Sequence, residues 1–152
     1  MPLTAHRPLT DRLIDSLYVE AMLLADEARG YFDEEGRFDR ERLPPILRVG
    51  FSCESLRVTT RLMHIIAWLL TRRAVAAGEI SETRAAAPER RLGAGQPSDP
   101  VILAGLPERA RQIIEATVEL HARIARLDSA SDPQAPSPSP ARTLFARLES
   151  VF

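Results

Sequence analysis

The sequence of 152 residues contains no lysine and no asparagine, and all 20 of its basic residues are arginine. Without lysine it cannot carry a phosphate-loop lysine, a Schiff base to pyridoxal phosphate or a Ser-x-x-Lys nucleophile. Its single cysteine, Cys53, excludes an intramolecular disulfide and a cysteine-rich zinc site. Several classes of enzyme and metal site are therefore excluded before any pattern is considered.

Long hydrophobic runs and strand patterns are also missing. The longest apolar stretch, residues 62–70, is interrupted by His64 and is about half of a membrane span. The first eight residues lack the apolar core of a secretory signal. The formal net charge is −1, so no bulk charge favours nucleic acid or acidic lipid. We therefore expect a cytoplasmic, soluble protein that binds neither membranes nor nucleic acid.

Helical periodicity dominates the remaining pattern. In three segments, about residues 10–35, 45–77 and 106–127, apolar residues recur at alternating spacings of three and four, which is typical of amphipathic helices. Thr10 is the expected cap of the first helix, and Gly36 its expected end. The predicted fold is all-α, an antiparallel three-helix bundle with a long central helix.

The segments outside these helices are rich in proline and glycine. Residues 81–87 are consistent with a short helical turn, and residues 88–105 read as a loop. Residues 128–142 hold four Pro, four Ser and no large apolar side chain, which predicts disorder. We therefore divide the chain into a bundle domain, residues 1–127, and a disordered tail with a short apolar end, residues 128–152.

The central helix carries two apolar stripes. One consists of Leu47, Phe51, Ser55, Val58, Leu62, Ile65 and Leu69. The other consists of Val49, Cys53, Leu56, Thr60, Met63, Ala67, Leu70 and Ala74. At about 100° per residue, their centres lie roughly 160° apart around the helix. Since two neighbouring helices cannot cover both stripes, we expect a homodimer.

Five residues of the second stripe define the predicted dimer or second packing face: Val49, Cys53, Leu56, Met63 and Leu70. In a homodimer, the central helix would lie near the two-fold axis. The alternative is that the short helix near Ser81, or the loop after it, covers this face within one chain.

Two further sets of residues are candidates for partner binding. One flank of the central helix carries Arg57, Arg61, His64, Trp68 and Arg72. Arg and Trp dominate interface hot spots, so this flank is a candidate partner-binding surface. The competing interpretation is that Glu54 and Arg57 form a solvated ion pair while Trp68 fills the edge of the core. The candidate recognition residues of the tail are Leu144, Phe145, Leu148 and Phe152.

No constellation of residues favours catalysis. Cys53 and His64 lie about 16 Å apart along one helix, far beyond hydrogen-bond reach. His64 and His121 lie on different helices and lack a third ligand for zinc. A hydrolase with both histidines beside a carboxylate in a polar cavity is the enzymatic alternative. We expect no catalytic residue, no cofactor and no metal site.

The stretch ESLRVTTRLM, residues 54–63, is followed by AWLL at residues 67–70 and RAV at residues 73–75. Together with Gly78-Glu79, this pattern resembles the alphaproteobacterial family named for the regulator of CtrA degradation, the RcdA-like proteins. The resemblance implies a dimeric three-helix bundle with a disordered C-terminal tail.

The same resemblance implies a function. RcdA-like proteins are non-enzymatic adaptors that help deliver cell-cycle transcription factors and response regulators to the ClpXP protease, and the tail is implicated in that role. The implied partners are a second copy of the chain, protease components and client regulators. The residues alone leave two alternatives open, a small dimeric helical regulator associated with transcription and a purely structural dimer.

Overall fold

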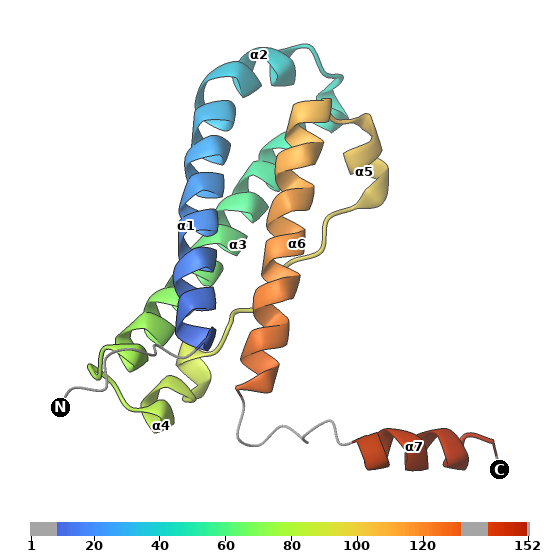
Figure 1. Ribbon diagram of the computed structural model, residues 1–152. Helices are drawn as coiled ribbons and strands as arrows, with labels where there is room; N and C mark the ends of the chain where they lie inside the picture. The colour runs from blue at the N-terminus through green and yellow to red at the C-terminus, as the bar shows by residue number, and fades with distance from the viewer. Residues whose placement is uncertain (1–8, 132–139, 152) are drawn as a thin grey trace.

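The computed structural model describes residues 9–131 and 140–151, and every regular element in these ranges is helical (Figure 1). The predicted all-α class is confirmed. No helix in the described ranges is long and apolar enough to cross a membrane. The elements in chain order are α1 (Leu9–Gly30), the π-helical turn η1 (Tyr31–Glu35), α2 (Gly36–Glu41), α3 (Pro45–Ala76), α4 (Glu82–Ala85), the 3-10 turn η2 (Pro88–Arg90), α5 (Pro100–Gly105), α6 (Glu108–Ala130) and α7 (Pro140–Glu149).

The long helices α1, α3 and α6 contact one another in pairs and form the helical body of the protein (Figure 1). Helices α1 and α3 run antiparallel. At one end Asp15 pairs with Arg73 at 3.5 Å, and near the other end the Tyr31 ring lies 6.3 Å from the Phe51 ring. The short link of residues 42–44 between α2 and α3 imposes this reversal of direction.

Helix α6 runs parallel to α3, so the expectation of three antiparallel helices is wrong for this pair. Arg61 contacts Thr117, and further along both helices Trp68 donates a hydrogen bond to Asp128. The connector, residues 77–107, returns along the body before α6 begins (Figure 1). Periodicity identifies both helices but carries no information about their relative direction.

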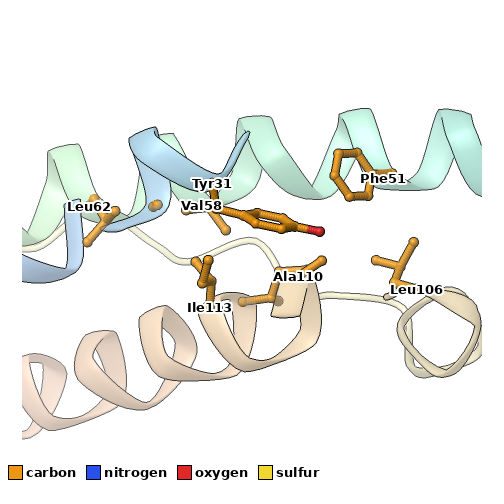
Figure 2. Close-up of a cluster of buried hydrophobic side chains, with 9 residues drawn as sticks. Tyr31, Phe51, Val58, Leu62, Leu106, Ala110 and Ile113 are labelled. Atoms are coloured by element: carbon orange, nitrogen blue, oxygen red, sulfur yellow. The ribbon is translucent and has the colours of Figure 1, made fainter. Parts of the chain in front are cut away.

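The core is formed by the faces of α1, α3 and α6 that point toward one another. The first stripe predicted on the central helix is the inner stripe of α3. Phe51, Val58, Leu62, Ile65 and Leu69 are buried, and the other two residues, Leu47 and Ser55, are partly buried. Figure 2 shows one of two core clusters, which contains Tyr31, Phe51, Val58, Leu62, Leu106, Ala110 and Ile113. The other cluster contains Ile14, Leu17, Ala21, Ile65, Trp68, Leu69, Leu120 and Ile124. Each large apolar side chain buried here contributes about 1.5–3 kcal/mol.

Gly36 does not end the first helical segment, contrary to prediction. The chain passes from α1 through η1 into α2 without leaving the helical conformation, and Gly36 has φ −62°. A Cβ atom at this position would lie 2.8 Å from the carbonyl oxygen of Tyr31 and 3.2 Å from the Phe51 ring. The glycine therefore permits close packing of the π-helical turn. Thr10 already lies inside α1, so it is not the N-cap.

The predicted bounds of α3 agree closely with the structure, and Gly78, with φ +75°, follows its last turn. The short helical turn near Ser81 is also confirmed as α4, whose N-cap Ser81 accepts from the Arg84 amide. The loop prediction for residues 88–105 is wrong in part, because η2 and α5 lie within it. Asp99 caps α5 by accepting a hydrogen bond from the Val101 amide at 2.9 Å.

The predicted start of the tail is too early. Helix α6 continues through Ala130 because Asp128 is held by hydrogen bonds from Trp68 and Arg91. Residues 140–149 form α7, so this part of the predicted disordered tail is helical. The remainder of the predicted disorder, residues 132–139, lies outside the described residues.

Two adjacent leucines of α3 test the assignment of its inner and outer faces. Leu69 is fully buried, whereas Leu70 is 47% exposed. Leu69→Ala is expected to lower the free energy of unfolding by about 2–5 kcal/mol because it leaves a cavity in the core. The matched variant Leu70→Ala is expected to lower it by less than about 1 kcal/mol.

Urea denaturation measures both values, at the lowest protein concentration that the signal allows, so that contacts between copies do not contribute. Equal losses in the two variants would contradict the assignment of faces.

Candidate functional site

The five residues predicted to bind a partner share one flank of α3: Arg57, Arg61, His64, Trp68 and Arg72. This flank is not open to solvent. Arg61 is 2% exposed and Trp68 is 4% exposed, and the other three residues are partly buried. Residues 88–99 of the connector lie against the flank. Arg61 and Trp68 are therefore buried within the chain and do not form an open partner-binding surface, and for Trp68 the competing interpretation, a place in the core, is confirmed.

Arg61 binds the connector directly. Its Nη2 donates to the carbonyl oxygen of Gln96 at 2.7 Å and to the hydroxyl of Ser98 at 2.8 Å. Ser98 in turn donates to Oε2 of Glu54 at 2.6 Å. The guanidinium thus crosslinks α3 to the connector through one backbone and one side-chain acceptor, and Nη1 also reaches the Thr117 hydroxyl of α6 at 3.4 Å.

The ion pair considered between Glu54 and Arg57 does form, but the carboxylate of Glu54 is fully buried, so the pair is not a solvated one. Its Oε1 accepts a hydrogen bond from Arg57 at 2.5 Å. Burial lowers the pKa of Arg61, the negative charge of Glu54 opposes this shift, and the positive charge of Arg57 adds to it. A guanidinium remains charged in proteins, so the cluster holds two cations around one buried anion.

A second group of hydrogen bonds holds the part of the same flank that is nearer the C-terminal end of α3. The indole Nε1 of Trp68 donates to Oδ1 of Asp128 at 2.8 Å. Arg91 of the connector donates to the same oxygen from Nε at 2.8 Å, and from Nη2 to the Asp128 carbonyl oxygen at 3.2 Å. Asp128 therefore joins α3, the connector and α6, which explains why Trp68 is unavailable to a partner.

The two histidines lie on either side of the connector. His121 Nε2 is 2.9 Å from the carbonyl oxygen of Gly93, and a Cβ atom on Gly93 would lie 2.5 Å from His64 Nδ1. His64 lines a hollow of about 590 Å³ together with Glu89, but His121 does not line it. The described residues contain no group of three metal-ligating side chains. The connector therefore packs closely against both histidine rings.

The second predicted stripe, the outer stripe of α3, is exposed from Val49 to Leu70, and Ala74 at its end is partly buried. Val49, Leu56, Met63 and Leu70 are 65%, 68%, 65% and 47% exposed. Cys53 is exposed as well. Neither α4 nor the connector covers this face. The alternative that the short helix near Ser81, or the loop after it, covers the face within one chain is therefore wrong. Contiguous apolar surface of this kind is characteristic of interaction sites.

The candidate recognition residues of the tail lie on α7. Leu144, Phe145 and Leu148 are 63%, 66% and 48% exposed, and Phe152 lies outside the described residues. Figure 1 shows α7 apart from the helical body. Among the described residues, the outer stripe of α3 and one face of α7 are therefore both exposed apolar surfaces.

Several residues of the polar cluster were missed at the level of sequence, namely Gln96, Ser98, Thr117 and Asp128. A backbone carbonyl such as that of Gln96 leaves no signal in the side-chain pattern. Gly93 and Gly95 could have indicated that the connector packs closely against the body, because glycine permits a backbone to approach another segment closely. A Cβ atom on Gly95 would lie 3.1 Å from the His121 ring.

The Arg61 cluster predicts a large effect on stability. Arg61→Met is expected to lower the free energy of unfolding by about 3–5 kcal/mol because Glu54 loses a neighbouring cation inside the protein. Arg48→Met, which changes an exposed arginine of the same helix, is expected to stay within about 0.5 kcal/mol of the parent chain. Urea denaturation compares the two variants. If Arg61→Met were as harmless as Arg48→Met, the cluster would not hold the connector.

The sequence matches, over residues 5–152, the family described as a protein of unknown function, DUF1465. The crystal structure of RcdA from Caulobacter crescentus CB15 is similar, with 30% sequence identity and a TM-score of 0.66. The match covers 84% of this chain and 94% of that chain. No curated protein matches the chain in sequence.

These findings agree with the resemblance carried by residues 54–79. The family match spans nearly the whole chain, and the similarity to RcdA covers the greater part of both chains. The chain therefore belongs to the DUF1465 family and is an RcdA-like protein.

Proposed function

We propose that this protein is a non-enzymatic adaptor that acts in the cytoplasm as a homodimeric helical bundle and helps deliver cell-cycle regulators to the ClpXP protease. The role is the one that the resemblance to RcdA-like proteins implies, and the family match and the similarity to the RcdA structure support that resemblance. The structural observation that supports it is the outer stripe of α3, an apolar face that no described residue of the same chain covers. An adaptor needs surfaces for other proteins.

The outer stripe is suited to a second copy of the chain. From Val49 to Leu70 it runs about 30 Å along α3. A self-complementary face of this length allows two α3 helices to pack across a two-fold axis, each stripe covering the other. The exposed side chains are aliphatic or sulfur-containing, as in homodimer interfaces, and the charged Arg61 cluster lies elsewhere on the helix.

A dimer leaves other surfaces for the protease and its clients. Delivery by an adaptor requires only that both are bound at once, since tethering raises the local concentration of the client near the protease. Helix α7 supplies a second apolar surface separate from the body. Weak contacts at two such surfaces suffice for delivery and still permit release.

The dimer is tested by placing a charge on the outer stripe. Met63→Arg is expected to convert a particle with the mass of two chains into one with the mass of a single chain, because burying an unpaired guanidinium is costly. The matched control is Leu23→Arg on α1, where the parent side chain is 66% exposed against 65% for Met63.

Size-exclusion chromatography with light scattering measures the mass of each variant. The control is expected to keep the mass of the parent. A parent chain that is monomeric at all concentrations, or a dimer that tolerates Met63→Arg, would contradict the proposed interface.

The adaptor role is tested by measuring protein half-lives in cells. Strains lacking this chain, and strains lacking the ClpX unfoldase, are compared with the parent strain by pulse-labelled proteomics. A shared set of response regulators or transcription factors is expected to become long-lived in both strains. If no regulator became long-lived in both strains, the adaptor role would be contradicted, while the fold and the proposed dimer would be unaffected.

A further inference from the structure

Six residues of the connector, residues 93–98, cross the flank of α3 and are called the strap here. They lack regular secondary structure, and none of them forms a hydrogen bond between backbone groups. The strap has no large apolar side chain, residues 94–97 are exposed, and neither core cluster contains a strap residue. A segment of this kind separates from the body at a much lower cost than a core helix does.

Side chains of α3 and α6 hold the strap in place. Arg61 donates two hydrogen bonds from Nη2, to the carbonyl oxygen of Gln96 at 2.7 Å and to the hydroxyl of Ser98 at 2.8 Å. The Nε2 atom of His121 lies 2.9 Å from the carbonyl oxygen of Gly93. The strap is therefore bound much as a separate extended peptide would be, through acceptor groups that helix side chains contact.

The surface beneath the strap carries an excess of positive charge. Arg57 and Arg61 surround the buried carboxylate of Glu54, whereas the strap offers Arg61 only neutral acceptors. Further along the flank, Asp128 is balanced by Arg91. A carboxylate presents two acceptor oxygens to a guanidinium, and such charge-assisted hydrogen bonds are roughly twice as strong as neutral ones. A carboxylate is therefore a better ligand for Arg61 than the strap itself.

We propose that the strap is a displaceable internal ligand, and that the surface beneath it binds an extended acidic segment of a partner protein. An Asp or Glu side chain of that segment replaces the two acceptors of Arg61, and one of its backbone carbonyl groups replaces that of Gly93 at His121. The strap joins η2 to α5, so it can move away while α1, α3 and α6 stay packed.

The test measures the binding of two fluorescein-labelled peptides to the purified full-length chain by fluorescence anisotropy. The acidic peptide, GAGEPEDP, repeats residues 93–100 with glutamate at the positions of Gln96 and Ser98. The reference peptide, GAGQPQDP, has glutamine at both positions. The two peptides therefore differ in charge and hardly in shape.

Ser98→Ala loosens the strap and leaves the helix side chains beneath it in place, because it removes one acceptor of Arg61 and the hydroxyl that donates to Glu54. This variant is expected to bind the acidic peptide at least about tenfold more tightly than the parent chain, since a site that is open more often has a higher apparent affinity. The matched control Gln96→Ala keeps the carbonyl group that Arg61 uses and is expected to bind like the parent.

A second loosening variant is Gly93→Val, because a Cβ atom there would lie 2.5 Å from His64 Nδ1. It is expected to give the same gain, and it replaces Ser98→Ala if circular dichroism shows that chain to be unfolded.

The place of binding is tested by adding Arg57→Gln to the loosened chain. This change removes one positive charge beside Glu54 and is expected to weaken binding of the acidic peptide at least about fivefold. Arg48→Gln, which removes an exposed arginine of the same helix, is expected to leave the affinity unchanged.

Three results would overturn the inference. Equal affinity of the loosened and parent chains for the acidic peptide would show that the strap does not compete with it. Equal binding of the two peptides would exclude an acidic ligand, and insensitivity to Arg57→Gln would place the peptide elsewhere. The measurements use only the purified chain and peptides, so their failure would leave the proposed adaptor role untouched.

Discussion

Helix α3 carries apolar side chains on two opposite faces, and its own chain buries only one of them. The inner face holds Ile65 and Leu69 at 0% exposure against α1 and α6. The outer face holds Leu56 and Met63, which remain more than 60% exposed. The first face is needed for folding, whereas the second contributes nothing to the core of one chain. The outer face is therefore where we propose that another protein binds.

The flank between those faces has a different role. Buried charges are costly to desolvate, and they persist where each one is paired and hydrogen-bonded. Arg61 and Glu54 meet that requirement by binding the connector through Gln96 and Ser98. The connector can then return along the body, which allows α6 to run parallel to α3. The flank was predicted to bind a partner, but its Arg61 holds the connector and thereby supports the parallel arrangement of α3 and α6.

Periodicity was sufficient to predict the elements but not their arrangement. The alternating spacing identified α1, α3 and α6 and separated the inner from the outer stripe of α3, because those features depend on side-chain polarity alone. The direction of α6 and the burial of Arg61 depend on where a connector backbone lies, and no side-chain pattern records that. Gly36 was misread for a similar reason: its small size serves contact with the Phe51 ring rather than a helix end.

We propose that a second copy of the chain covers the outer face of α3. Cys53 is the single cysteine and lies on that face, so the unmodified sequence accepts one nitroxide label per chain there. Pulsed electron–electron double resonance then measures the distance between labels in two copies. The account predicts one short, narrowly distributed distance. A signal without dipolar modulation, or a broad distribution of long distances, would contradict it.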